Sequence, residues 1–157
     1  MSGQLLGFDP SRQDEIPKFT PGREHRDAQG RLWKYVRANG AQTAGEVSQV
    51  AKDGTYDATP MTTTTVNSLT HDCVVPDIDV TDNYYYWGFA GEGEFEIVAA
   101  NGVTANSVLT STGTAGEVGT GGTPVDGLLN IDAGVTSTRV TCFAHKRLSV
   151  GVTPAYD

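Results

Sequence analysis

Short apolar segments separated by turn residues run through most of this chain, and residues 84–122 show the pattern most clearly. Glycine and threonine interrupt the apolar segments there, and the whole chain holds 19 glycines and 7 prolines, which leaves little room for helix. Only residues 99–109 could form a helical turn, and Gly102 and Val103 weaken it. Many short strands at regular turn spacing predict an all-β fold, a small antiparallel β-barrel or sandwich.

Alternation of apolar and polar residues marks the expected strands. They cover residues 32–37, 46–51, 73–75, 108–111, 125–130 and 138–144, with residues 60–65 as an edge strand or loop. Residues 84–90 and 94–100 are expected to pair as a hairpin through the turn Gly91-Glu92-Gly93.

The first 30 residues differ from the rest. Pro10, Pro17 and Pro21 interrupt both helical and strand periodicity, and the few large apolar residues are too sparse for a core. We therefore predict an extended N-terminal arm over residues 1–30 and a β domain over residues 31–157. The arm is either a loose tail or a strap that docks elsewhere, and the usual mobility of termini favours the tail.

Charge and hydropathy exclude several partners. The chain has 11 Lys and Arg against 19 Asp and Glu, a net charge of −8, which argues against nucleic acid as a partner because phosphate binding needs clustered positive charge. No apolar run approaches the roughly 20 residues that span a bilayer. The first residues lack the charged and apolar regions of a signal peptide, so we expect the protein to be made and used in a cytoplasm.

Two cysteines, Cys73 and Cys142, are too few for a disulfide framework. Their neighbours are apolar, which predicts two buried thiols that behave as small hydrophobic side chains. A bridge between them would require an oxidising compartment.

Three glutamates invite a catalytic interpretation. Glu92, Glu94 and Glu96 would face one side of a strand, and carboxylates two residues apart lie roughly 6.5–7 Å apart, within the range of inverting glycosidases. An acid of this kind usually lies in a pocket that raises its pKa, and the sequence indicates none. We therefore predict that these carboxylates line the solvent face, with Phe95 and Ile97 facing the core.

A second acidic group, Asp77, Asp79 and Asp82 with Asn83, suggests calcium. Its spacing fails the EF-hand pattern, which requires glycine at position 6 and glutamate at position 12. A turn that enters the next strand is favoured, although a surface calcium ion remains an alternative.

Other chemical motifs are missing. His25, His71 and His145 are scattered singly, no serine lies in a nucleophile-elbow pattern, and the glycine-rich tract over residues 113–122 lacks a phosphate-binding lysine. We predict no catalytic, cofactor-binding or metal-binding residue, no cofactor, and no enzymatic activity.

The order of the β segments resembles the small head proteins of tailed phages of the decoration (cement) type. Trp87-Gly88 and residues 95–99 match the central hairpin of these proteins, and residues 112–116 with residues 125–128 match a later one. The opening strand corresponds to residues 35–41, and the closing segment to residues 148–151. The resemblance covers about residues 35–151, whereas the arm has no counterpart and residues 61–75 diverge.

This resemblance implies a non-enzymatic virion protein that binds the outside of the expanded capsid, usually as a trimer over local three-fold positions. Its partners would be the major capsid protein and its own copies, with assembly in the host cytoplasm and neither nucleic acid nor membrane as a partner. Because such a protein binds the assembled shell and not separated subunits, mass action stabilises the shell, and repetition enlarges the effect.

Two sets of residues are expected to make these contacts. The apolar residues of the arm would bind the capsid: Leu5, Leu6, Phe8, Ile16 and Phe19. Two strands carry large apolar side chains on both faces and need a second covering layer, which closed symmetry would supply. The residues expected at that subunit interface are Trp33, Tyr35, Tyr85 and Trp87.

Other functions remain open. A phage tail-fibre or baseplate module would share this composition but would more often show repeats, which are not found. A carbohydrate-binding module would expose the aromatic residues 84–87, and a small glycoside hydrolase would hold one of the three glutamates in a cleft.

Overall fold

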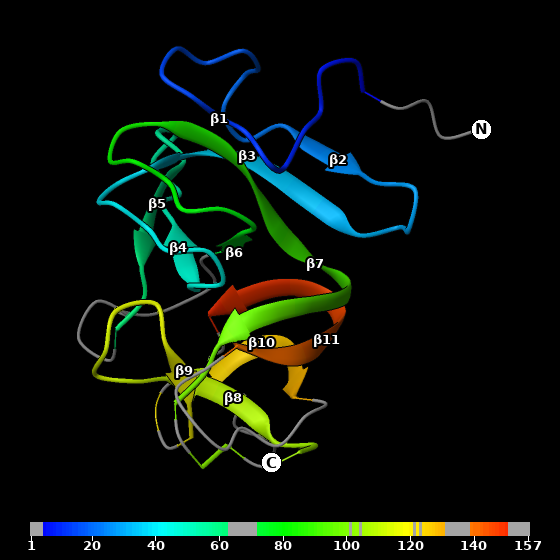
Figure 1. Cartoon of the computed structure of the whole chain (residues 1–157), viewed down its shortest axis with the longest axis vertical. Coiled ribbons are helices and arrows are strands. Elements are labelled where there is room, and N and C mark those ends of the chain that lie inside the picture. The colour runs from blue at the N-terminus through cyan, green and yellow to red at the C-terminus, as the bar shows by residue number, and fades with distance from the viewer. Residues whose placement is uncertain are drawn as a thin grey trace.

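The chain folds as an assembly of strands joined by turns, most of them short and two of them 12 and 14 residues long (Figure 1). The computed structural model describes residues 5–62, 72–100, 102–103, 105–120, 122, 124–130 and 139–150, and these residues form eleven strands and no helix. The strands are β1 (Gln13–Asp14), β2 (Glu24–Arg26), β3 (Leu32–Ala38), β4 (Ser48–Val50), β5 (Asp57–Pro60), β6 (Cys73–Pro76), β7 (Tyr85–Val98), β8 (Val108–Ser111), β9 (Val118–Gly119), β10 (Pro124–Asn130) and β11 (Arg139–Val150). The all-β prediction is confirmed.

Most of the expected strands are found. Residues 32–37, 46–51, 73–75, 108–111 and 125–130 correspond to β3, β4, β6, β8 and β10, and residues 138–144 to the start of a longer β11. The threonine-rich segment at 60–65 is only partly covered, because β5 ends at Pro60 and residues 63–65 lie outside the described residues.

Five strands pair into a ring. Strand β3 pairs with β5, β5 with β4, β4 with β6, β6 with β7, and β7 returns to β3. The β3–β5 pair is parallel, unlike the antiparallel arrangement that the sequence predicts, and the other four pairs are antiparallel. Successive residues of a strand point to opposite faces, so β3 and β7 supply two separate clusters of buried side chains.

The two clusters have different compositions. One holds mostly small residues: Leu32, Val36, Ala38, Val50, Ala58, Val74, Val80, Tyr86 and Ala90. The other is larger and rich in aromatic residues, with Trp33, Tyr35, Trp87, Phe89 and Phe95 packed with aliphatic side chains of the C-terminal strands. Cys73 and Cys142 both lie in this larger cluster as buried free thiols, as predicted.

The C-terminal strands extend the sheet from the second half of β7, in the order β7-β11-β10-β8-β9. In Figure 1 they lie at the end of the molecule opposite the N-terminal arm. Backbone hydrogen bonds join this sheet to the ring, from Val47 N to Gly116 O at 2.8 Å and from Val98 N to Gly45 O at 2.9 Å. These bonds hold the C-terminal sheet directly against the ring.

The expected hairpin at residues 91–93 is wrong, because β7 continues without reversing from Tyr85 to Val98. Gly91, Glu92 and Gly93 all have positive φ, as a turn would require, but they lie instead where the pairing of β7 with both β3 and β11 shifts in register. Leu32 pairs with Gly91 and Trp33 with Phe89, so one residue of β7 is left over between the two pairs. A side chain at Gly91 would lie 2.4 Å from the carbonyl oxygen of Lys146, so glycine permits the close approach of β11.

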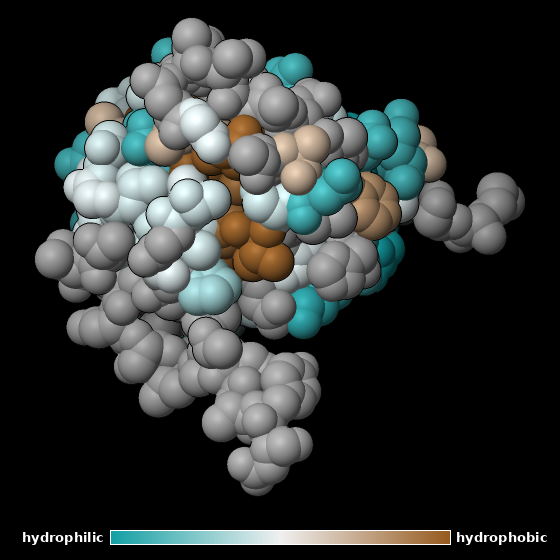
Figure 2. All heavy atoms as spheres, turned by 90° about the horizontal axis from the view of Figure 1, so that it is seen from below, coloured by the Kyte–Doolittle hydropathy of each residue, from teal (hydrophilic) through white to brown (hydrophobic). Residues whose placement is uncertain are grey.

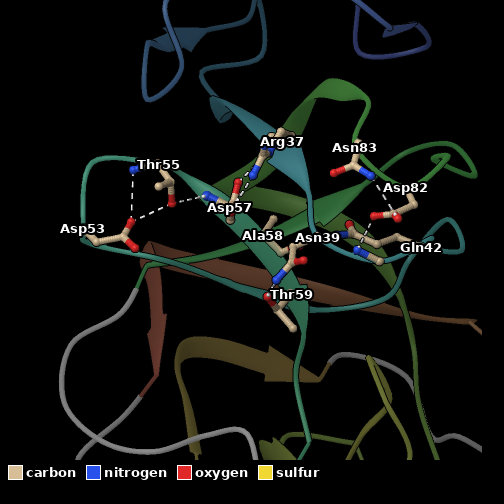
Figure 3. A network of polar contacts seen from close by, with 11 residues as sticks. Arg37, Asn39, Gln42, Asp53, Thr55, Asp57, Ala58, Thr59, Asp82 and Asn83 are labelled. Atoms are coloured by element: carbon tan, nitrogen blue, oxygen red, sulfur yellow. Dashed lines mark hydrogen bonds and ion pairs between the residues drawn. The ribbon is translucent and has the colours of Figure 1, made fainter.

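Polar contacts fix the loop that follows β3 (Figure 3). Arg37 forms two hydrogen bonds with Asp57, at 2.7 and 2.8 Å, beside the parallel pairing of β3 with β5. Gln42 donates to the carbonyl oxygen of Ala58 at 2.7 Å and accepts a hydrogen bond from the Tyr86 hydroxyl at 2.6 Å. Burial raises the pKa of Tyr86, which keeps this hydroxyl a donor.

Candidate interaction surface

The N-terminal arm lies along the β domain in its described part, residues 5–30. Strand β1 pairs with β7 through Gln13 and Asp14, and β2 pairs with β3 through residues 24–26. These residues are therefore attached to the sheet, and the favoured interpretation of a loose tail does not hold for them. They cover the larger cluster of buried side chains, which is rich in aromatic residues and is called the aromatic cluster below.

Two aromatic side chains anchor the arm. The Phe8 ring lies 5.1 Å from Trp87 and 5.9 Å from Trp33, in edge-to-face arrangements. The Phe19 ring lies 5.2 Å from Tyr35 and 5.1 Å from Trp87, also edge to face. Such pairs stabilise beyond the area that they bury, so two side chains are enough to hold an extended segment.

A buried polar contact adds to these anchors. The Tyr35 hydroxyl donates to Asp14 Oδ2 at 2.9 Å and accepts a hydrogen bond from the Lys18 backbone N–H at 3.2 Å. Lys18 Nζ lies 3.2 Å from the same carboxylate, which is itself buried. Burial raises the pKa of Tyr35, so the hydroxyl keeps the proton that it shares with Asp14.

Ion pairs fasten β2 to the C-terminal strand β11. Glu24 pairs with Arg147, which lies 3.6 Å from Asp72, and Asp72 pairs with Lys34 at 2.7 Å. The hydrogen bond from Arg147 holds the pKa of Glu24 below its ordinary value, against the effect of partial burial. This network joins residues more than 100 positions apart in the chain, since Glu24 and Arg147 are separated by 123.

The turn between β2 and β3 is organised by Asp27. Its carboxylate accepts hydrogen bonds from the Arg31 backbone and side chain and, at 2.9 Å, from Trp33 Nε1. Burial alone would raise the pKa of Asp27, but the hydrogen bonds from Trp33 and Arg31 outweigh it and lower the pKa. The same carboxylate thus positions the arm and one member of the aromatic cluster.

The residues expected at a subunit interface are placed differently from the prediction. Trp33, Tyr35 and Trp87 are at most 2% exposed, and Tyr85 is half-buried. The need for a covering layer is real, but in the single chain the cover is the chain's own N-terminal arm. This is a correction: three of the four side chains have no surface to offer another subunit.

The residues expected to bind the capsid divide into two groups. Leu5, Phe8 and Phe19 are half-buried and pack against the aromatic cluster. Leu6 is 95% exposed and Ile16 is 77% exposed, so these two side chains point away from the domain that holds them. An anchored segment with two large apolar side chains in solvent is a candidate interaction surface.

The opposite end of the molecule also exposes apolar side chains. Val108 on β8 is 58% exposed and Phe143 on β11 is 42% exposed. Seen from that end, apolar residues gather in the middle of the face, beside more polar ones (Figure 2). The two apolar surfaces therefore lie on different parts of the fold, one on the arm and one on the C-terminal sheet.

The structure also places the residues considered for chemistry. Glu94 and Glu96 are exposed while Phe95 and Ile97 are buried, which confirms the predicted solvent face; Glu92 is half-buried and pairs with Arg26. Tyr86 and Trp87 are buried, so the strand offers neither ring as an open platform for sugars.

The aspartates near β7 act as hydrogen-bond acceptors. Asp79 accepts a hydrogen bond from the Ala44 N–H at 2.9 Å. Asp82, labelled in Figure 3, accepts one from the Gly40 N–H at 2.7 Å, and both bonds support the predicted turn. Within the described ranges, no three His, Cys, Asp or Glu residues are grouped to hold a metal ion. His25 packs on Phe8 at 4.5 Å, His145 lies on β11, and His71 lies outside the described residues.

Comparisons with known proteins find similarity only among solved structures. No protein-family model matches the chain, and no curated protein matches it. A solved structure, the N base of head fiber gp8.5 in bacteriophage phi29, is similar over 77% of this chain and 94% of that one, with 14% sequence identity and a TM-score of 0.47. At that TM-score and identity we draw no functional conclusion from the similarity.

In the part of the chain that the structure describes, no helix is long and apolar enough to cross a membrane.

Proposed function

We propose that this chain is a non-enzymatic structural protein of a tailed-phage head, which binds the outside of the expanded capsid and stabilises it. The class of partner comes from the resemblance in sequence to phage decoration proteins. The observation that carries the proposal is the anchored arm, which holds Leu6 and Ile16 in solvent while Phe8 and Phe19 fix its path.

The physical reason is that the arm is ordered before it binds. Fully burying a leucine or isoleucine side chain contributes about 1.5–3 kcal/mol, and a segment already held in place loses little further conformational freedom on docking. Each contact would be modest, but the same contact repeats over a shell that the protein binds only when assembled. The partner would be the major capsid protein, and the protein would act on the capsid surface of the virion.

Copies of the chain would also contact one another, as a trimer at local three-fold positions. This part of the proposal does not use Trp33, Tyr35 or Trp87, which the arm covers. The net charge of −8 supports a protein that stays soluble at high concentration and does not bind packaged nucleic acid. Neither a membrane nor a cofactor has a part in this function.

The test is co-sedimentation of the purified protein with expanded, undecorated heads. The double variant Leu6→Ser/Ile16→Ser should fold normally, because both side chains are exposed, and should lose at least tenfold in affinity for heads. The matched control is Val108→Thr, which changes an exposed apolar residue on the C-terminal sheet and should bind as the wild type does. Full binding by the double variant would overturn the role of the arm, and failure of the wild type to bind heads would overturn the function.

A further inference from the structure

The second half of β7 has one unpaired edge within the described structure. Residues 93–98 pair with β11, as in Phe95 with Cys142 and Ile97 with Val140. On the other edge β3 accompanies β7 only as far as Gly91, because β3 begins at Leu32 and the chain before it turns away toward β2. No described strand pairs with residues 93–97 on that edge.

The backbone polar groups of Glu94 and Glu96 point to this open edge. The N–H of Val98 donates to the carbonyl oxygen of Gly45 at 2.9 Å, so it points away from β11. Backbone N–H and C=O groups alternate between the two edges of a strand, and residues two apart share a direction. The N–H groups of Glu96 and Glu94 are therefore directed to the same side as that of Val98.

A hollow lies beside this edge and over the face of the sheet that carries Glu94 and Glu96. One part, of about 280 Å³, is lined by Arg31, Pro76, Asp77, Glu94, Phe95, Glu96 and Thr141. An adjoining part is lined by Gln29, Arg31, Gly93 and Glu94, so Arg31 and Glu94 belong to both. The missing side chain of Gly93 leaves room for the stem of Arg31, whose Cγ would lie 2.6 Å from a Cβ there.

The charges of the hollow that have no ion-pair partner among the described residues are the negative charges of Glu94 and Glu96. Glu94 and Glu96 are exposed and have no ion-pair partner among the described residues. Arg31 already pairs with Asp27 at 2.7 Å. Between the two glutamates, Phe95 turns its ring to the core, where it stacks on Phe89 at 4.6 Å.

We propose that this edge of β7 is a strand-addition site for an extended segment of a partner protein with the pattern basic-apolar-basic. Added antiparallel, in line with β3, such a segment would exchange backbone hydrogen bonds with Glu94 and Glu96 and continue the sheet. Its two basic residues would lie opposite the two carboxylates, and the apolar residue between them would face the side of Phe95. A second copy of this chain is disfavoured, because its net charge is −8 and glutamates on an edge strand repel acidic neighbours.

The experiment titrates ¹⁵N-labelled full-length protein with a capped peptide, acetyl-Thr-Lys-Val-Lys-Thr-amide, and follows amide shifts by NMR. We expect shifts confined to residues 91–98 and 29–31, and slower hydrogen exchange at the amides of Glu94 and Glu96. The same peptide with both lysines replaced by glutamate should bind at least tenfold more weakly. The protein variant Glu94→Gln/Glu96→Gln should lose this lysine preference, whereas Glu15→Gln, exposed in the arm, should keep it.

Backbone methylation separates strand addition from simple charge attraction. Methylating the amide nitrogens of both lysines removes the donors directed at β7 and should abolish binding. Methylating the valine nitrogen, whose N–H points away from β7 in an antiparallel pair, should leave binding within threefold. Equal binding of the lysine and glutamate peptides, equal effects of the two methylations, or an absence of shifts at residues 93–98 would each overturn the proposal. This test is independent of head binding, so its outcome and that of the proposed function can be told apart.

Discussion

The two halves of β7 have different surroundings although they belong to one strand. The first half, residues 85–90, has strands on both edges, β3 on one and β1 and β6 on the other. Both of its faces are covered, Tyr86 and Ala90 by the smaller cluster, and Trp87 and Phe89 by the larger one. The second half, residues 93–98, keeps one paired edge and one covered face, and it presents Glu94 and Glu96 to solvent.

The first half of β7 therefore stabilises the fold, whereas the second half is accessible to a binding partner. A segment that is apolar on both faces must be covered, and here the N-terminal arm covers it. A segment that alternates apolar with charged residues needs only one cover, so its second face and its open edge stay accessible. The surfaces that we propose for function, Leu6 and Ile16 on the arm and the edge at residues 93–97, both lie outside the covered region.

The largest expected effect is the loss of Trp87. Trp87→Ala removes a side chain that packs against Phe8, Phe19 and Tyr35, and it should lower the free energy of unfolding by roughly 3–5 kcal/mol. Urea unfolding followed by circular dichroism measures this change. A loss below about 1 kcal/mol would mean that the first half of β7 is not held by its covered faces.

Removing an anchor of the arm should have a smaller effect. Phe8→Ala deletes a half-buried ring and should cost roughly 1–2 kcal/mol, less than a fully buried aromatic side chain. It should also make tryptophan fluorescence more accessible to a soluble quencher, because Phe8 lies over Trp33 and Trp87. The matched control is Leu6→Ala, which removes an exposed side chain of the same arm. Equal behaviour of the two variants would show that the arm does not cover the cluster in solution.

Acid should weaken the attachment of β2 to β11. The pKa of Glu24 is lowered in the folded protein by its hydrogen bond with Arg147, so its contribution to stability is present above its ordinary pKa of 4.5 and is lost as the pH falls through the lower, folded value. Wild-type Tm should therefore fall on acidification below about pH 4.5, and Glu24→Gln should lose less over the same range. Glu15→Gln should follow the wild type, and parallel curves for all three proteins would contradict a role for the Glu24 pair.

The smallest expected effect lies in the second half of β7. Glu96→Gln changes an exposed carboxylate without a partner in the described structure, and it should alter the free energy of unfolding by about 0.5 kcal/mol or less. Urea unfolding beside Trp87→Ala makes the comparison within one strand. A loss above about 1 kcal/mol would show that this half is engaged within the fold and not free for a partner.

Local pattern predicted the strands well and their connections less well. Gly91, Glu92 and Gly93 adopt the positive φ values that a turn needs, but a bulge needs them too. Whether the chain reverses there depends on strands distant in sequence, since β11 approaches Gly91 closely on one edge while β3 ends on the other. Residues 91–93 alone carry no information about either neighbour.

The cover of the aromatic side chains of β3 and β7 could likewise be predicted only in part from the sequence. Large apolar side chains on both faces of β3 and β7 correctly predicted that a second layer was needed, but the sequence did not identify the arm as that layer. The apolar residues of the arm are too few for a core, yet Phe8 and Phe19 are enough to anchor an extended strap. The buried Asp14 and the paired Glu24 were also missed, because their partners Tyr35 and Arg147 are distant in the chain.

The measurement that tests the functional claim most directly is quantitative mass spectrometry of virus particles purified from the source of this chain, with heads and tails separated. The proposed function predicts that the protein is found in the head fraction, at a copy number close to the number of local three-fold positions multiplied by three. Its absence from heads, or its recovery with tails at low copy number, would contradict the decoration role and favour a tail-fibre or baseplate module.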